Sequence, residues 1–326
     1  MLLTKLKNTA IAAAAVATLC ASSFALAQNA VRIGGTGNYG PVLPVAAAEK
    51  LELFKQLGVE VTFTTFSSGA AGMEGLAAKE VDLINYFPPG LALAKRSGVK
   101  ARVVGAGTLT PRGWHVMVKN DSPLKEVKDL AGKKLGISGA GSTTDFFGLW
   151  AASQSGGGVT RIPVGGQGLI PNMRSGNVDA IVAYPPLSYT VMLSGDGRSL
   201  VDFGSEMPIN LPDVWVASDE IIEKNPEGLR KALIGIYSAI VYMQAHPEWT
   251  IEFISSETGM TKEIATEEYK NTIKGLSADG ALKQEWVAES LKLATLAGIK
   301  DVPPVDDMFT TEFVPVESVQ PEKAKQ

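Results

Sequence analysis

Three glycines near the start of the chain, in the stretch VRIGGTGNYGP, have the spacing of a phosphate-binding turn. Gly35, Gly37 and Gly40 spell G-x-G-x-x-G directly after a short apolar run, which is the fingerprint of dinucleotide-binding enzymes. The next expected strand, however, ends at Phe66, where such an enzyme would carry an acidic residue for the ribose. Pro41 also crowds the turn. We therefore expect no dinucleotide and no other cofactor, and we expect the glycines to let the backbone approach a ligand closely.

Serines and threonines gather at two further junctions where an expected strand gives way to a helix. The stretch FSSGAAG contributes Ser67 and Ser68, and GAGSTTDF contributes Ser142, Thr143 and Thr144. A helix start leaves backbone N–H groups unpaired, and its dipole favours negative charge. These hydroxyls therefore either donate to an anionic ligand or cap their own helices, and capping is the more common role for any single serine.

The chain offers little for hydrolytic or metal chemistry. It contains two histidines and one cysteine, and it has no G-x-S-x-G nucleophile elbow. His115 lies in an expected strand with no acid or nucleophile paired to it, and Cys20 lies in the N-terminal leader. We therefore expect neither an enzyme nor a metal site.

The first residues have the pattern of a secretory signal peptide. A short positive start precedes an alanine-rich apolar run, and Ala25-Leu26-Ala27 forms a small-x-small cleavage site. We expect cleavage after Ala27, which makes 1–27 the signal peptide and leaves an exported chain without a thiol. Lipidation at Cys20 is the disfavoured alternative, because Leu19 stands where a small residue is usual.

The charge balance excludes a nucleic-acid partner. The chain carries 30 Lys and Arg against 34 Asp and Glu, a net charge of -4, and no basic block occurs. A nucleic-acid backbone requires clustered Lys and Arg. Beyond the leader, no apolar stretch reaches the roughly 20 residues that a membrane-spanning helix needs.

Short apolar runs alternate with amphipathic stretches from Val31 onward, which predicts an α/β fold with mostly parallel sheets. The pattern turns helical from Asp219 to about Gly298.

Two segments of the sequence, KEVDLINYFPPGLAL and GNVDAIVAYPPLSYT, resemble each other. Both contain Val-Asp, an expected strand, an aromatic residue and Pro-Pro in the same order, with Phe87 and Tyr184 at the aromatic position. This match has two interpretations. Either Pro-Pro simply marks the start of a helix after a strand, as proline often does, or the chain contains two similar α/β lobes. Facing lobes would form a cleft, since ligands bind at the carboxyl ends of parallel strands.

With these stretches and NDSPLKEVKDLAGKKLGISGAGSTTDFF, the chain resembles the periplasmic substrate-binding proteins of ABC importers, of the nitrate/sulfonate/taurine type. The yeast thiamine-pyrimidine synthases share that fold. The resemblance implies a two-lobed periplasmic binding protein of type II, with a ligand cleft between α/β lobes and two hinge crossovers, which we place in 109–116 and 208–215. The implied division is lobe 1 at 28–117 plus 208–310, lobe 2 at 118–207, and a polar, disordered tail at 311–326.

The same resemblance implies a function in transport. The protein would capture a small organic, anionic ligand (a sulfonate, carboxylate, nitrate or pyrimidine-like compound) and deliver it to a permease and ATPase in the inner membrane. We expect a periplasmic monomer. The alternatives are a ligand sensor for a receptor partner and, less favoured, a synthase-like enzyme, which would require cysteine and histidine near the site.

The family's ligand residues, carried over by position, lie at the ends of the expected strands and beside the first crossover. Arg112 would pair with an anion there, unless it is only a solvated hinge residue. The implied set is Asn38, Tyr39, Gly40, Ser67, Ser68, Gly69, Tyr86, Phe87, Arg112, Ser142, Thr143, Thr144 and Tyr184.

Overall fold

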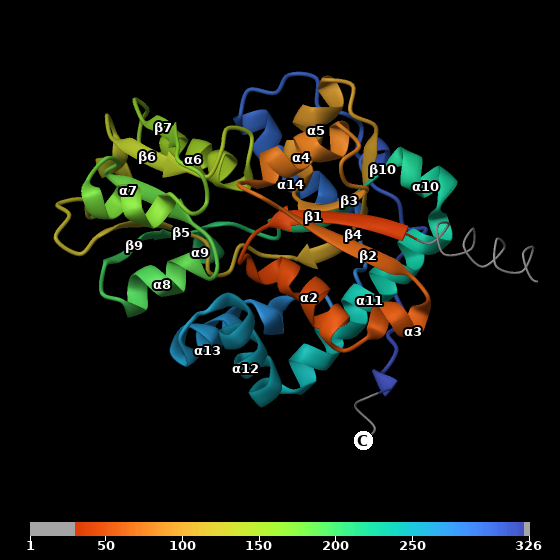
Figure 1. Cartoon of the computed structure of the whole chain (residues 1–326). Coiled ribbons are helices and arrows are strands. Elements are labelled where there is room, and N and C mark those ends of the chain that lie inside the picture. The colour runs from red at the N-terminus through yellow and green to blue at the C-terminus, as the bar shows by residue number, and fades with distance from the viewer. Residues whose placement is uncertain (1–29, 323–326) are drawn as a thin grey trace, which may run out of the picture.

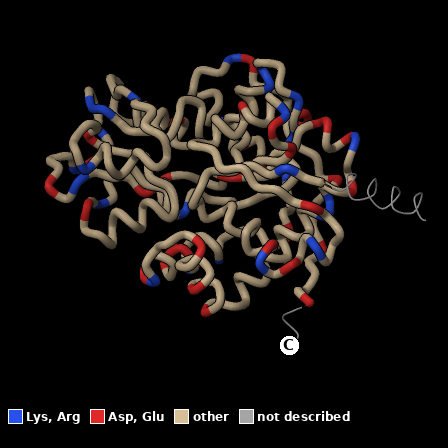
Figure 2. The backbone as a smooth tube through the Cα atoms, viewed as in Figure 1, with Lys and Arg blue, Asp and Glu red and all other residues tan. Residues whose placement is uncertain are grey.

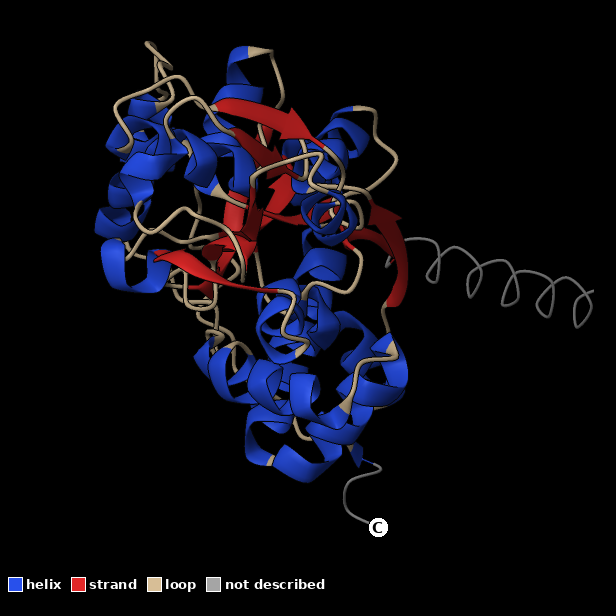
Figure 3. Cartoon of the chain, turned by 90° about the vertical axis from the view of Figure 1, so that its left-hand side faces the viewer, coloured by secondary structure: helices blue, strands red, loops and turns tan. Residues whose placement is uncertain are grey.

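The computed structural model describes residues 30–322 of the chain. The expected signal peptide and its cleavage site lie outside the described residues. Figure 1 shows two α/β lobes, each built on one five-stranded sheet, as the alternation of apolar and amphipathic stretches predicts. Figure 3 shows the helices packed around both sheets.

The first lobe is built on a mixed sheet with the strand order β2-β1-β3-β10-β4. Strands β2 and β3 both pair parallel with β1, whereas β10 pairs antiparallel with β3 and β4. The strands are β1 (Ala30–Thr36), β2 (Glu60–Phe66), β3 (Leu83–Tyr86), β4 (Ala101–Thr108) and β10 (Asp213–Ser218).

The second lobe repeats this topology with the order β7-β6-β8-β5-β9. Here β7 and β8 pair parallel with β6, and β5 pairs antiparallel with β8 and β9. The matched segments of the sequence thus form β3 and β8, which hold equivalent places in the two sheets. The strands are β5 (His115–Lys119), β6 (Lys134–Ile137), β7 (Thr160–Pro163), β8 (Ala180–Ala183) and β9 (Gly197–Asp202).

Thirteen α-helices cover the sheets within residues 30–322. The first lobe carries α2 (Leu43–Lys50), α3 (Leu53–Leu57), α4 (Gly69–Ala77), α5 (Pro88–Arg96), α10 (Asp219–Lys224), α11 (Pro226–Ala245), α12 (Pro247–Thr258), α13 (Lys262–Asn271) and α14 (Gln284–Leu296). The second carries α6 (Thr143–Gln154), α7 (Leu169–Ser175), α8 (Leu187–Leu193) and α9 (Phe203–Glu206). Short 3-10 turns are η1 (Gly40–Val42), η2 (Val127–Leu130), η3 (Ile273–Gly275) and η4 (Val305–Asp307).

Helix α11 shows how the sequence specifies the first lobe. Asn225 caps its first turn by accepting from the Gly228 amide at 3.0 Å, and Pro226 begins the helix, where its missing N–H costs nothing. Leu229, Leu233 and Ile236 then recur at helical spacing and are buried. The helical run predicted from residue 219 to about 298 is confirmed as α10 to α14.

The predicted disorder of the tail is wrong as far as residue 322. Phe313 is only 2% exposed, the Val316 amide donates to the Asp279 carbonyl at 2.8 Å, and the Val319 amide donates to Ser238 Oγ at 2.8 Å. The polar composition hides apolar residues in FVPVESV, and these pack against the first lobe. The tail therefore extends the core of that lobe.

The chain crosses between the sheets twice. It leaves β4 at Thr108 and enters β5 at His115, and it leaves β9 at Asp202 and returns into β10 at Asp213. The lobe boundaries themselves stay a prediction. Positively and negatively charged residues are interspersed along the backbone of both lobes (Figure 2). None of the helices within residues 30–322 is long and apolar enough to cross a membrane.

Candidate ligand-binding site

The first turn of α6 gathers a cluster of hydroxyl groups from the second lobe. Ser142 caps the helix by accepting from the Asp145 amide. Its Oγ also lies 2.7 Å from Thr144 Oγ1 and 3.1 Å from Ser138 Oγ, and all three side chains are buried. Thr143 is the exception, because its hydroxyl makes no hydrogen bond within residues 30–322 while it lines a cavity. Thr143 is thus the hydroxyl that remains available to a ligand.

The first turn of α4 faces the same cavity from the first lobe. Ser68 caps this helix by accepting from the Ala71 amide at 3.2 Å. Gly69 follows and lines the cavity, and a Cβ on it would lie 2.9 Å from the Tyr86 ring. The bare backbone at Gly69 therefore lets the ring of Tyr86 approach the start of the helix.

The cavity between these helix starts, which we call the inner cavity, has a volume of about 30 Å³. That volume holds a water molecule or two, and an organic ligand requires the lobes to part. The lobes close over it through hydrogen bonds from Tyr86 Oη to the Gly141 carbonyl at 2.7 Å and from the Gly166 amide to the Ser67 carbonyl at 3.1 Å. The lining residues are Thr36, Tyr39, Gly69, Asn85, Tyr86, Trp114, Ser138, Ser142, Thr143, Thr144, Tyr184 and Pro212.

Three aromatic rings form one wall of the inner cavity. Tyr39 from the first lobe packs edge-to-face on Tyr184 from the second, with ring centroids 5.3 Å apart, and on Trp114 at 6.0 Å. Tyr39 is 7% exposed, and its hydroxyl has no hydrogen-bond partner within the described residues. Burial raises the pKa of Tyr39 well above its usual value, so the group stays protonated and able to donate. A buried donor without a partner is costly unless a ligand accepts from it.

Asn85 enters the inner cavity from β3, and a buried carboxyl group holds it in place. Asp213 accepts from Asn85 Nδ2 at 3.2 Å and from the Thr108 amide at 3.1 Å, and it also bonds the Thr108 hydroxyl. Burial raises the pKa of Asp213 to about 6. Asp213 does not itself line the cavity, so its role is to position Asn85.

The residues that line the inner cavity include no Lys, Arg, His, Asp or Glu. An anion would therefore be held by hydroxyls, an amide and the free N–H groups of the two helix starts, whose dipoles favour negative charge. The nearest acid in α6, Asp145, is paired with Arg161. This ion pair offsets the negative charge of Asp145 beside the site.

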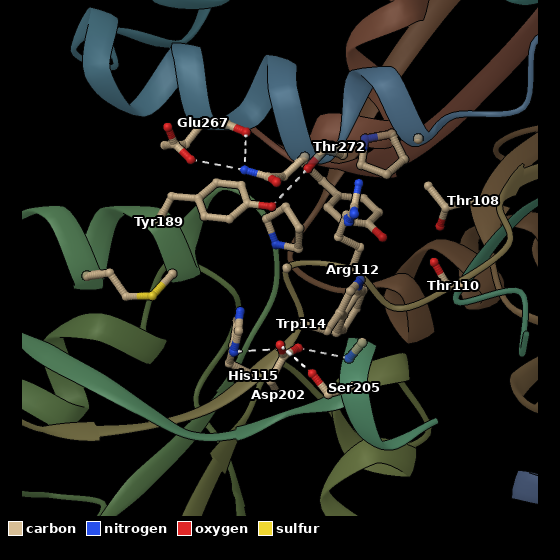
Figure 4. A pocket seen from close by; sticks show the side chains of 18 of the residues that line it. Thr108, Thr110, Arg112, Trp114, His115, Tyr189, Asp202, Ser205, Glu267 and Thr272 are labelled. Atoms are coloured by element: carbon tan, nitrogen blue, oxygen red, sulfur yellow. Dashed lines mark hydrogen bonds and ion pairs between the residues drawn. The ribbon is translucent and has the colours of Figure 1, made fainter. Parts of the chain in front are cut away.

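A second and larger cavity, the outer cavity, lies beside the two crossovers and measures about 660 Å³ (Figure 4). Tyr39 and Trp114 line both cavities, so they form the partition between them. The rest of its lining is Pro41, Thr108, Thr110, Arg112, Gly113, His115, Pro185, Tyr189, Met192, Leu193, Asp202, Gly204, Ser205, Glu267, Asn271, Thr272 and Gly275.

The structure divides the predicted site residues among several places. Seven of them meet in the inner cavity: Tyr39, Gly69, Tyr86, Ser142, Thr143, Thr144 and Tyr184. Arg112 lies in the outer cavity, and Asn38 lines a separate groove beside α2. Ser67 and Ser68 join the lobes and cap α4, and Phe87 is buried with its ring 5.0 Å from that of Phe146.

Gly40, the last glycine of the fingerprint, faces protein instead of a cavity. A Cβ on Gly40 would lie 1.6 Å from Glu268 Oε1 of α13. Glu268 is completely buried, it accepts from Thr272 Oγ1 at 3.1 Å, and burial raises its pKa to about 8. The other two glycines also make room for side chains, because a Cβ on Gly35 would lie 2.8 Å from Val42 and one on Gly37 would lie 2.8 Å from Thr65.

Five lining residues were not expected from the sequence: Thr36, Asn85, Trp114, Ser138 and Pro212. The positions of three of them in the sequence could have predicted their place in the site. Thr36 ends β1, Ser138 follows β6, and Asn85 is the polar residue near the end of β3, so all three stand near the carboxyl ends of strands that pair in parallel. Trp114 and Pro212 lie in the crossovers, where no such pattern applies.

The chain matches known proteins over most of its length. The model of the family described as NMT1/THI5 like matches residues 41–250. A putative binding protein of Brucella abortus is 26% identical over 267 residues, which cover 80% of this chain and 82% of the relative. A putative aliphatic sulfonates-binding protein of Bacillus subtilis is 25% identical over 292 residues, 86% of each chain.

The fold also matches solved structures. The alkanesulfonate-binding protein of Xanthomonas axonopodis pv. citri, solved with bound MOPS, superposes with a TM-score of 0.74 at 18% identity, covering 85% of this chain and 95% of that one. This likeness confirms the two-lobed periplasmic binding protein fold that the sequence predicts.

Proposed function

Because the chain belongs to the NMT1/THI5-like family, we propose that it is the periplasmic solute-binding component of an ABC importer and that it closes its lobes around a small organic anion. In this proposal the leader is cleaved after Ala27, the mature monomer acts in the periplasm, and the loaded protein delivers its ligand to a permease and ATPase of the inner membrane. The names of the relatives favour a sulfonate over the other anions.

The observation that carries the proposal is that Tyr39, whose buried hydroxyl has no hydrogen-bond partner among the described residues, lines the inner cavity. Gly69 and Thr143, which begin two helices from different lobes, line the same cavity. Donors from both lobes around one small space suit an oxyanion head, because each oxygen accepts more than one hydrogen bond. A ligand held this way stabilises the closed arrangement, since it contacts both lobes at once.

The lining also supports binding without turnover. No ionisable group other than tyrosine faces the inner cavity, and His115 is committed elsewhere, with Nδ1 2.9 Å from Ser199 Oγ. The proposal therefore contains no catalytic step. A sensor for a receptor partner would use the same cleft, and the presence of permease and ATPase genes beside this one would distinguish the importer.

Calorimetry with matched probes tests the proposal. Ethanesulfonate, propanoate, nitrate and a hydroxymethylpyrimidine are titrated into the protein, and ethanesulfonate is expected to bind most tightly. Thr143→Ala removes a donor to a charged group, which contributes about 1.5 to 3 kcal/mol, or a tenfold to hundredfold loss of affinity.

The control is Thr295→Ala, on the exposed side of α14, which should bind the probe as the wild type does. If the wild type binds none of the four probes, the proposed ligand class is excluded. Unchanged affinity of Thr143→Ala with a lowered melting temperature would assign Thr143 to helix stability alone.

A further inference from the structure

The outer cavity is large enough for a ligand, and it adjoins the inner one. Its volume of about 660 Å³ lies within the roughly 300–1,000 Å³ of small-molecule sites. The inner cavity, at about 30 Å³, holds only a water molecule or two until the lobes part. Both lobes and both crossovers contribute to the lining of the outer cavity, so its shape changes when the lobes move.

The partition between the cavities is itself a contact between lobes. Tyr39 from the first lobe packs its ring against those of Tyr184 and Trp114, at centroid distances of 5.3 and 6.0 Å. No hydrogen bond holds the Tyr39 hydroxyl in place. Because Tyr39 and Tyr184 belong to different lobes, parting of the lobes would open this partition and join the two cavities.

Arg112 is the cation of the outer cavity, and it has no counter-ion there. Its side chain makes no hydrogen bond or ion pair within residues 30–322, although it lines the cavity with Trp114 and Thr272. Figure 4 draws it in the middle of the cavity, between those two residues in the view. A guanidinium in such a place recognises a carboxylate or a similar planar oxyanion by two parallel hydrogen bonds.

The acids of the outer cavity are already engaged. Asp202 accepts from the Gly204 amide and from Ser205 Oγ, both at 2.9 Å, and so caps α9. Glu267 pairs with Lys270 at 3.3 Å and accepts from Asn271. Burial lowers the pKa of His115, so that ring is neutral at neutral pH. Arg112, which is exposed, is therefore the cation of this cavity that has no hydrogen-bond or ion-pair partner among the described residues.

We propose that the outer cavity is a second subsite of the same binding site, in which Arg112 binds a second acidic group of the ligand. The ligand is then a short organic dianion, with an oxyanion head in the inner cavity and a carboxylate in the outer one. This inference rests on the proposed function, because the head group must bind between the lobes. The carbon chain joining the two groups passes between Tyr39 and Trp114.

A matched pair of probes tests the second subsite. Propane-1-sulfonate and 3-sulfopropanoate have the same length and differ in a methyl group against a carboxylate. Calorimetry measures the ratio of their dissociation constants for the wild type, Arg112→Gln and Arg112→Lys, with 4-sulfobutanoate and 5-sulfopentanoate added to vary the length. Arg96→Gln, an exposed charge removal on α5, controls for overall charge.

We expect the wild type and Arg96→Gln to prefer at least one dianion by about threefold to fivefold, since Arg112 is exposed and an exposed ion pair contributes about 1 kcal/mol or less. Arg112→Gln should reduce that ratio to about one, and Arg112→Lys should retain part of it. If the wild type binds propane-1-sulfonate and every dianion equally, the second subsite is wrong while the proposed function stands. If no probe binds, the proposed ligand class fails and the subsite fails with it.

Discussion

The first strand–helix turns of the two lobes hold equivalent places in the two sheets, yet side chains fill them differently. After β1, the turn GTGNYGP places Gly40 against the buried carboxyl group of Glu268. After β6, the turn GAGSTT gathers hydroxyls at the start of α6 and leaves Thr143 available. A glycine-rich turn thus marks a close approach of two parts of the chain. What approaches, protein or ligand, depends on the element that packs against it.

The comparison between the two turns is tested most strongly by Glu268, whose ionisation should make the unfolding free energy depend on pH. Its pKa in the folded protein, about 8, lies above its usual value because it is buried. The folded protein keeps this acid neutral up to about pH 8. Its contribution to the unfolding free energy is therefore fully present below about pH 4.5, the usual pKa, and is lost as pH rises from there to about 8. Glu268→Gln should lack this fall, which amounts to several kcal/mol at about 1.4 kcal/mol per pKa unit.

Urea unfolding of both proteins between pH 4.5 and 8.5 measures the difference. Asp213, whose pKa is raised to about 6, contributes the same pH dependence to the unfolding free energy of both proteins. Its effect therefore cancels in the difference between them. Glu267→Gln, on the same helix but half-exposed, serves as the control. Parallel pH profiles for wild type and Glu268→Gln would show that the carboxyl group beside Gly40 is solvated.

Gly40→Ala should lower the unfolding free energy by a smaller amount. The added Cβ would lie 1.6 Å from Glu268 Oε1 and 3.0 Å from Thr272, so the buried Glu268 side chain or α13 must shift, and overpacking of this kind costs about 1–3 kcal/mol. Gly275→Ala, where a Cβ meets open space, should cost far less. Chemical denaturation compares the two, and equal stabilities would mean that Gly40 is not there to admit Glu268.

The smallest effect concerns closure. Tyr86→Phe removes the bond from the first lobe to the Gly141 carbonyl in the second, which contributes about 0.5–1.5 kcal/mol. Without ligand, the variant should populate a more open form with a larger radius of gyration in solution scattering. Tyr242→Phe, at a half-buried tyrosine of α11 that lines neither cavity, should scatter as the wild type does. An unchanged radius for Tyr86→Phe would indicate that other contacts hold the lobes together.

Much of the fold could be predicted because its signals are local. The alternation of apolar and amphipathic stretches, and the Pro-Pro sequence after β3 and β8, identify the elements and their repetition. Part of the site follows from the same logic, since Ser142 to Thr144 stand where a strand meets a helix. The environment of Gly40 could not be predicted, because Glu268 lies more than two hundred residues later in the sequence. The buried tail escaped prediction because its few apolar residues are spaced among polar ones.

The two crossovers are fastened to each other along their length. Where they leave the first lobe, Asp213 bonds both the amide and the hydroxyl of Thr108. Further along, the Leu109 carbonyl accepts from the amides of Asn210 and Leu211 at 3.0 and 3.2 Å, and the Phe203 amide donates to the Trp114 carbonyl at 3.0 Å. Two tethers joined in this way resist sliding past each other while they still bend together. We therefore expect the lobes to open and close mainly as a hinge, which would return the donors of both lobes to the same positions at each closure.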